Sequence, residues 1–193
     1  MNRNGTLIIL VGGASRRMGR PKHLLETADG TLIESMTKRL SPLFRETLLV
    51  GREIGVVPEG IRFVEDLRLE RSPLVGIYSG LCRSRTVANF VVGCDMPFVE
   101  PDLIGGLFER SVDADVTVPV VNGFYEPLCA VYRHSCISAI ERALDMGCLK
   151  TTSFYPDVRV REMSEQAVCR FDPGLVSFTN LNTPKQLALL ARL

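Results

Sequence analysis

The sequence predicts an α/β fold, built as a three-layer α/β/α sandwich around a mostly parallel sheet. Uninterrupted apolar runs alternate with segments whose apolar residues recur at helical spacing, and this alternation repeats four times. The first apolar run, at 6–11, leads directly into a glycine-rich segment. Because strand–helix–strand units cross over with one hand, the carboxyl ends of the strands should meet at one edge, where α/β proteins bind ligands.

The first half of the chain supplies most of the expected parallel sheet. We expect strands at 6–11, 47–50, 61–64 and 89–94, and helices at 32–40, 73–81 and 103–108. The first helix is indicated by apolar residues at Leu32, Ile33, Met36 and Leu40, which share one helical face. Pro73 suits the first turn of the second helix.

The second half predicts further strands at 116–121, 128–132 and 158–161, and helices at 134–146 and 183–193. Asn122-Gly123, between the first two of these strands, is typical of a tight turn. Gly147 is expected to end the first helix. Thr183 and Pro184 suit the cap and first turn of the last one.

Length and composition favour a single globular domain spanning 1–193. Hydrophobic residues make up 46% of the chain and charged residues 23%, both ordinary values. The formal net charge is only +1, which disfavours a nucleic-acid partner. The apolar run 7–11 is too short for a secretion signal or a membrane span, so we expect a cytoplasmic protein with no membrane partner.

The six cysteines are scattered and form no C-x-x-C pair. A chain of this size needs no disulfides to stabilise its core. We therefore interpret the cysteines as buried free thiols, most of them in apolar surroundings, and not as a zinc site.

The segment after the first strand indicates an anion-binding loop. Gly12, Gly13 and Gly19 allow the backbone to turn sharply and to approach a ligand closely. Four cations follow within seven positions: Arg16, Arg17, Arg20 and Lys22. Their mutual repulsion would be relieved by a triphosphate. The pattern is neither a Walker loop nor a dinucleotide fingerprint, and for an isolated segment a solvated basic turn would be the alternative.

Two aspartates follow strands that should end at the same edge. Asp95 comes directly after the apolar run 89–94. Mg²⁺ takes one or two protein carboxylates together with phosphate oxygens and water, so Asp95 beside a triphosphate could hold the ion, although it could instead cap the next helix. Asp66 follows the strand at 61–64 and could orient the nucleotide or the metal, or simply form a surface turn.

These segments together resemble the molybdenum cofactor guanylyltransferase (MobA) family, within the GT-A-like nucleotidyltransferases. The resemblance spans nearly the whole chain. The matching motifs, in the family's order, are Leu10-Val11-Gly12-Gly13-Ala14-Ser15-Arg16-Arg17-Met18-Gly19 with Lys22, Ser72-Pro73-Leu74-Val75-Gly76-Ile77, Cys94-Asp95-Met96-Pro97-Phe98, Glu126-Pro127-Leu128-Cys129-Ala130-Val131-Tyr132 and Asn180-Leu181-Asn182-Thr183-Pro184. The chain departs from the family pattern in having Pro21 where an acidic residue is common.

The resemblance implies a Rossmann-like, GT-A-type sheet with a nucleotide-binding half at about 1–100 and a pterin-acceptor half at about 101–193. It implies transfer of GMP from GTP to the terminal phosphate of molybdopterin, or of its molybdenum form, with Mg²⁺ as cofactor. Molybdoenzyme maturation proteins are candidate partners. The implied site residues are, as catalytic groups, Lys22, Asp95 and Arg16; as nucleotide-binding groups, Leu10, Gly12, Gly13, Lys22, Asp66 and Asp95; on the pterin side, Asn180 and Asn182; and, as the metal ligand, Asp95.

Rival functions remain open at this point. The nearest is a CTP-dependent molybdopterin cytidylyltransferase or a sugar-phosphate nucleotidyltransferase, although Gly12-Gly13 in place of Ala-Gly favours guanine. A second is a non-catalytic nucleotide-binding or cofactor-delivery protein. Lys22 and Asp95, which serve turnover, argue against the second.

Overall fold

The computed structural model describes residues 3–12, 22–28 and 30–181. Its core is an eight-stranded sheet in the order β10-β7-β9-β6-β1-β4-β5, with β8 paired to β7. The strands are β1 (Arg3–Leu10), β4 (Phe44–Gly51), β5 (Arg62–Glu65), β6 (Ala88–Gly93), β7 (Val116–Val121), β8 (Phe124–Tyr125), β9 (Cys129–Arg133) and β10 (Val160–Met163). The pairs β1–β4, β1–β6, β4–β5 and β7–β10 are parallel, which confirms the predicted mostly parallel α/β sheet.

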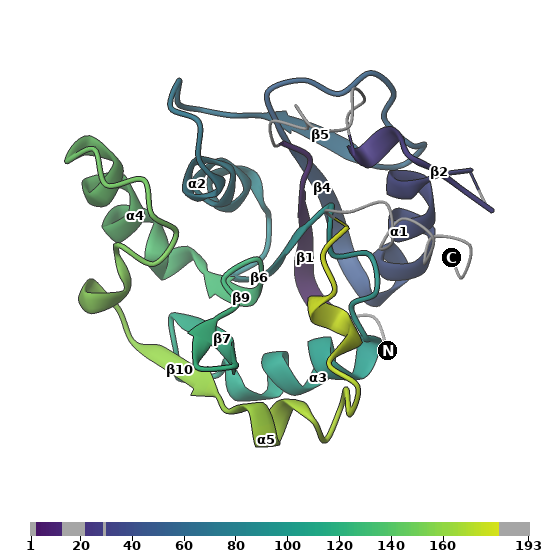
Figure 1. Cartoon of the computed structure of the whole chain (residues 1–193). Helices are drawn as coiled ribbons and strands as arrows, with labels where there is room; N and C mark the ends of the chain where they lie inside the picture. Colours follow the sequence, from purple (N-terminus) through teal and green to yellow (C-terminus); the bar gives the residue numbers. More distant parts are fainter. Residues whose placement is uncertain (1–2, 13–21, 29, 182–193) are drawn as a thin grey trace.

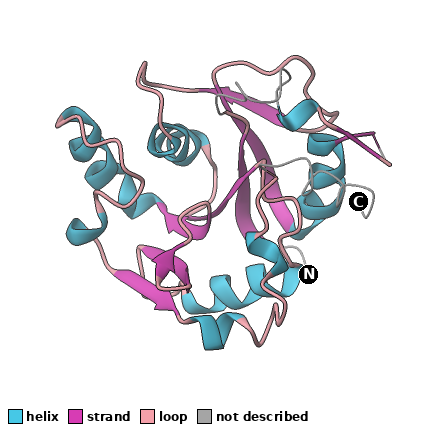
Figure 2. Ribbon diagram, viewed as in Figure 1, coloured by secondary structure: helices cyan, strands magenta, loops and turns pink. Residues whose placement is uncertain are grey.

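Helices cover both faces of this sheet, as Figures 1 and 2 show. The α-helices are α1 (Leu32–Leu40), α2 (Pro73–Arg83), α3 (Pro101–Arg110), α4 (Ile137–Asp145) and the short α5 (Glu165–Val168). Helices α1 and α3 lie on one face, and α2 and α4 on the other. Short 3₁₀ turns complete the described chain at η1 (Lys22–Leu24), η2 (Ser41–Leu43), η3 (His134–Cys136), η4 (Tyr155–Asp157) and η5 (Val176–Phe178), and a small separate hairpin joins β2 (Glu26–Thr27) to β3 (Gly30–Thr31).

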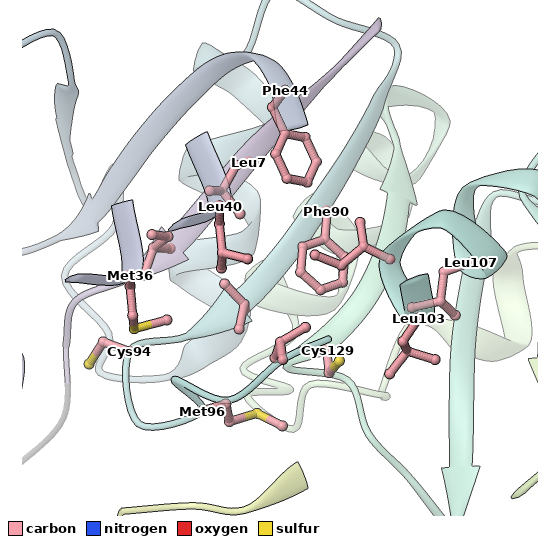
Figure 3. Close-up of a cluster of buried hydrophobic side chains, with 14 of the residues drawn as sticks. Leu7, Met36, Leu40, Phe44, Phe90, Cys94, Met96, Leu103, Leu107 and Cys129 are labelled. Atoms are coloured by element: carbon pink, nitrogen blue, oxygen red, sulfur yellow. The ribbon is translucent and has the colours of Figure 1, made fainter. Parts of the chain in front are cut away.

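The two hydrophobic clusters follow from the alternation of side chains along the strands. In β1, Leu7 and Ile9 face α1 and α3, whereas Ile8 and Leu10 face α2 and α4. Figure 3 shows the first cluster, in which Phe90 stacks on Phe44 with ring centroids 6.2 Å apart. Both faces of the central strands are therefore buried, which is why these strands were recognisable as continuous apolar runs.

Antiparallel pairing is confined to the second half of the sheet. Strand β9 runs antiparallel to both of its neighbours, β6 and β7. The predicted turn at Asn122-Gly123 is present, with φ of 51° and 79°, but it joins β7 to the two-residue strand β8 and not directly to β9. Residues 126–128 bulge out between β8 and β9, which places them beside the end of β6.

Several predicted boundaries in this half were wrong. The helix expected at 134–146 begins as the 3₁₀ turn η3, and α4 starts only at Ile137. The strand expected at 158–161 is β10, two residues later, because the N–H of Val158 closes η4 by bonding to the carbonyl of Tyr155. The helix expected at 183–193 lies outside the described residues.

The six cysteines all lie in the described ranges and none is in a disulfide. Cys94, Cys129 and Cys136 are buried, as predicted, and Cys82 and Cys169 are half-buried. The prediction was wrong for Cys148, which is exposed because it follows the end of α4. Burial raises the pKa of the Cys136 thiol to about 12, so this sulfur stays protonated at neutral pH. No helix among the described residues is long and apolar enough to cross a membrane.

Candidate functional site

The carboxyl ends of β1, β4, β5 and β6 form one rim, and backbone hydrogen bonds join its members. The N–H of Cys94 donates to the carbonyl of Leu10 at 3.1 Å, and the N–H of Val11 donates to Val50 at 2.8 Å. The N–H of Asp66 donates to the carbonyl of Gly51 at 3.0 Å. The segments that carry Gly12, Asp66 and Asp95 therefore leave the sheet at the same edge, as expected for parallel strands.

Asp95 is held in a tight turn at the end of β6. The N–H of Met96 donates to the carbonyl of Gly93 at 3.0 Å, and the Asp95 side chain folds back over Gly93. A Cβ at Gly93 would lie 2.6 Å from Oδ1 of Asp95, so any larger residue would displace this carboxylate. The carbonyl of Asp95 accepts the N–H of Leu181 at 2.9 Å. The turn therefore fixes the carboxylate at the rim, half-buried beside the C-terminal segment.

A guanidinium from helix α1 supports the chain that follows Asp95. Arg39 donates to the carbonyl of Val99 at 2.9 Å and to that of Pro97. Burial lowers the pKa of Arg39, and the nearby Glu100 opposes this shift. The N–H of Glu100 donates to Oγ of Ser177 at 3.0 Å. The segment 96–100 is thus tied on one side to α1 and on the other to η5.

The C-terminal segment reaches the rim through a buried carboxylate. Asp172 is 2% exposed and accepts the N–H groups of Val176 and Ser177 at 3.0 and 2.8 Å. Figure 1 shows this segment, in yellow, running back toward the strands, and the buried Leu181 anchors it in the core. Asn180 therefore lies next to the residue that bonds to Asp95, which brings two of the predicted site residues together.

Asp66 has an unusual environment for a carboxylate at a surface turn. Its Oδ1 atom is buried and meets no hydrogen-bond donor among the described residues. Burial raises its pKa, Arg52 acts in the opposite direction, and Glu65 adds to the rise. An orphaned acceptor of this kind costs free energy unless a bound group donates to it. Its position and its missing partner both fit a ligand-binding role.

Of the other residues predicted to form the site, three lie in the part of the chain that the structure describes and three lie outside it. The Leu10 side chain is 6% exposed and packs against α2, where a Cβ on Gly76 would approach its Cδ2 to 3.0 Å, so only its backbone faces the rim. Gly12 is exposed, and a Cβ there would have no neighbour within 4 Å. Lys22 is described only by its backbone, at the start of η1. The predicted residues Gly13, Arg16 and Asn182 lie outside the described residues.

Two rim residues were not predicted as part of the site. Arg39 has no local sequence signal, because its partners are backbone carbonyls some sixty positions away. Glu126 was noted only as part of a motif. It lies in the 126–128 bulge, half-buried, and burial raises its pKa. The carbonyl of Leu128 in the same bulge accepts the N–H of Gly93 at 3.2 Å, which brings Glu126 to the Asp95 side of the rim.

A hollow of about 280 Å³ lies farther along the same edge, between the β7–β8 hairpin and residues 150–152. Phe124, 73% exposed, and Lys150 contribute to its walls. It therefore offers an aromatic surface and a cation beyond the bulge that carries Glu126.

A family model described as a MobA-like NTP transferase domain matches residues 7–155, which include the rim and every strand of the sheet except β10. The chain belongs to this family. A MobA-like relative named probable molybdenum cofactor guanylyltransferase, from Pelotomaculum thermopropionicum, is 40% identical over 183 residues and matches 94% of this chain and 89% of its own. A relative with the same name from Natranaerobius thermophilus is 34% identical over 194 residues, covering 97% and 95% of the two chains.

Solved structures agree with the MobA-like assignment. The crystal structure of molybdopterin-guanine dinucleotide biosynthesis protein A from Archaeoglobus fulgidus is 28% identical and covers 97% of both chains with a TM-score of 0.82. The 2-C-methyl-D-erythritol 4-phosphate cytidylyltransferase of Thermus thermophilus has a TM-score of 0.72 at 16% identity, a likeness of fold alone. The GT-A-type nucleotidyltransferase fold expected from the sequence is thereby confirmed.

Proposed function

We propose that this chain transfers GMP from GTP to the terminal phosphate of molybdopterin, forming molybdopterin guanine dinucleotide and pyrophosphate. Two kinds of observation support the proposal. Relatives that are 30–40% identical over almost the whole chain carry the name molybdenum cofactor guanylyltransferase or probable molybdenum cofactor guanylyltransferase. The hydrogen bond between Cys94 and Leu10 sets the Asp95 turn directly beside the strand end from which the cationic glycine loop leaves. This juxtaposition is the observation on which the proposal mainly depends.

In this reaction the protein has chiefly to position the two substrates and to neutralise the charge on their phosphates. The phosphate monoester of the acceptor is already ionised near neutral pH, so its oxygen can attack the α-phosphorus of GTP in line without a strong base. A bond forms from that oxygen to the α-phosphorus as the bond to the β-phosphate breaks, and pyrophosphate leaves. By resemblance to the family, Arg16, Lys22 and the backbone N–H groups of Gly12 and Gly13 would stabilise the charge on the phosphates.

The donor set at Asp95 fits a magnesium ion shared with the substrate. Mg²⁺ prefers oxygen ligands and takes few from the protein when phosphates supply the rest. Asp95 offers a carboxylate at the rim, whereas no cluster of three or more candidate ligands occurs among residues 3–12, 22–28 and 30–181. A bound Mg²⁺ would neutralise phosphate oxygens. Gly93 leaves room for the Asp95 carboxylate, and the hydrogen bond from Leu181 fixes the Asp95 backbone. Together they hold the carboxylate where such an ion would lie.

The acceptor would approach from the side of the C-terminal segment. The N–H of Leu181 bonds to the carbonyl of Asp95, which brings the adjacent residue Asn180 close to Asp95. The family resemblance assigns Asn180 and Asn182 to the pterin side. The two amide side chains could donate to and accept from a pterin ring.

The reaction is tested by measuring pyrophosphate release with molybdopterin, Mg²⁺ and each nucleoside triphosphate in turn. We expect release with GTP and little with CTP, ATP or UTP. Preference for CTP would identify the cytidylyltransferase instead. Binding of GTP without pyrophosphate release would identify the non-catalytic alternative.

Asp95→Ala tests the metal site. We expect at least about a 100-fold loss of turnover with little change in the midpoint of thermal unfolding, because the removed charge acts on the substrate phosphates. Asp113→Ala is the matched control, an exposed aspartate before β7 at the opposite edge of the sheet, and should leave turnover unchanged. Equal loss of turnover and stability in Asp95→Ala would assign this residue a structural role.

A further inference from the structure

A cluster of charged and aromatic side chains ties the loop that carries Asp66 to helix α4. Nη2 of Arg68 lies 2.8 Å from Oδ1 of Asp145 and 3.8 Å from Oε1 of Glu141. The same guanidinium lies over the ring of Tyr78, 5.7 Å from its centroid. The Tyr78 hydroxyl in turn donates to Glu141 at 2.7 Å. Arg68 thus connects the loop after β5 with α2, which carries Tyr78, and with α4.

Within the described part of the chain, the other hydrogen bonds that hold this loop involve its backbone. The N–H of Asp66 bonds to Gly51, and the N–H of Leu67 donates to Oγ of Ser79 on α2 at 2.8 Å. The carbonyl of Leu69 accepts a hydrogen bond from Arg52. Arg68 is therefore the residue of this loop whose side chain reaches α4, and it lies two positions from Asp66.

Because the cluster is exposed to water, its loss should affect the position of the loop more than the stability of the fold. The side chains of Arg68, Glu141 and Asp145 are 29%, 47% and 57% exposed. Ion pairs this accessible to water contribute little to folding. Their loss should leave the fold intact while freeing the loop to move, and with it the Asp66 carboxylate, whose Oδ1 meets no donor among the described residues.

We propose that Arg68 is a positioning residue, which holds the 66–69 loop against α2 and α4 so that Asp66 faces the bound nucleotide. The inference rests on the proposed function, since it assigns Asp66 to the nucleotide. It adds that Asp145, on a helix of the acceptor half, takes part in setting the affinity for GTP. The contribution of Asp145 is indirect and passes through Arg68.

Removing either charge of the Arg68–Asp145 pair tests this role, because charge alone predicts opposite effects. If only long-range electrostatics mattered, Arg68→Met would weaken binding of the anionic GTP and Asp145→Asn would strengthen it. Positioning predicts that both weaken it. We expect calorimetric titration to give a Kd for GTP about five- to tenfold higher in Arg68→Met and about two- to fivefold higher in Asp145→Asn. In the double variant the Kd should be no higher than in Arg68→Met alone.

Two controls accompany these variants. Arg142→Met removes an exposed arginine of α4, whose partner is Asp157 at 3.8 Å, and should leave the Kd unchanged. Arg68→Lys retains the charge but not the planar guanidinium, and should recover only part of the affinity. Hydrogen exchange supplies a readout without ligand, and the amide of Leu67 should exchange faster in Arg68→Met than in Arg142→Met.

Asp66→Asn separates failure of the inference from failure of the proposed function. If Asp66→Asn weakens GTP binding while Arg68→Met and Asp145→Asn do not, the positioning role is wrong and the proposed function stands. If Asp145→Asn binds GTP more tightly, the effect of Arg68 is electrostatic and the inference is again wrong. If Asp66→Asn binds GTP normally, the assignment of Asp66 to the nucleotide fails, and the positioning role with it.

Discussion

Two carboxylates at the strand rim are held in different ways. Asp95 rests over Gly93, and its backbone is bonded to Leu181. Asp66 is bonded through its backbone N–H, whereas its buried Oδ1 meets no donor within the described part of the chain. The free energy that this acceptor costs in the folded protein would be recovered when a ligand donates to it. Asp66 should therefore lower the stability of the free protein and strengthen ligand binding.

Asp66→Asn tests the effect of this carboxylate on stability, through the pH dependence of unfolding. Burial raises the pKa of Asp66 in the folded protein, so its stabilising contribution is complete below the ordinary aspartate pKa of about 3.9 and is lost as the pH rises through the folded value. We expect Asp66→Asn to be more stable than the natural protein at pH 7, because burial disfavours the charged carboxylate. The gain should be only about 0.5–1 kcal/mol, because the carboxyl group is only partly buried. Urea unfolding at pH 7 and at pH 3.5 should show this difference disappearing in acid. A less stable variant at pH 7 would contradict the prediction.

At the scale of elements, the close approach of α2 to β1 sets the geometry beneath the rim. A Cβ on Gly80 would lie 2.8 Å from Cγ2 and 2.9 Å from Cδ1 of the fully buried Ile8. Glycine at this position therefore lets the helix pack directly on the central strand. Because α2 also carries Ser79 and Tyr78, which contact the 66–69 loop, the depth of this packing bears on the site.

Gly80→Ala should destabilise the protein by about 1–2 kcal/mol. The added methyl group overpacks the core by about 1–3 kcal/mol, and the better helix propensity of alanine offsets part of this cost. Gly55→Ala is the matched control, since a Cβ there has no neighbour within 4 Å and should change stability by less than about 0.5 kcal/mol. Chemical denaturation measures both. A neutral Gly80→Ala would mean that Ile8 can change rotamer without cost.

At the scale of the molecule, strands from both halves of the chain belong to one sheet. Strand β9, from the second half, pairs with β6 from the first along five residue pairs. The two hydrophobic clusters likewise combine residues from both halves, such as Phe90 with Val131 and Val91 with Ala130. Neither half could bury its side of the sheet alone, which supports one cooperative domain.

We therefore expect a single unfolding transition in urea. Far-UV circular dichroism reports on the whole chain, whereas three of the four tyrosines, Tyr125, Tyr132 and Tyr155, lie in the second half, and the chain has no tryptophan. The midpoints from circular dichroism and from tyrosine fluorescence should coincide. Separate midpoints would indicate two independently unfolding units.

The alternation of elements and the chemistry at the strand ends could be predicted from local patterns in the sequence. Buried parallel strands are apolar on both faces, and glycine, aspartate and cationic residues directly after them are local signals. For this reason β1, β4, β6 and α1 could be placed within a few residues, and Asp66 and Asp95 could be assigned to one edge. The later boundaries were harder to predict, because η3 and the 126–128 bulge depend on partners distant in sequence.

The support of the rim residues comes from contacts that form only in the folded chain. Arg39 bonds to carbonyls at 97 and 99, and Arg68 pairs with Asp145, contacts that connect positions about sixty to eighty residues apart. No periodicity or local motif indicates these contacts, since Arg39 bonds to backbone carbonyls, and Arg68 and Asp145 taken alone are ordinary charged residues. The physical reason is that a hydrogen bond or an ion pair depends on distance in space, whereas sequence patterns report only on neighbours along the chain.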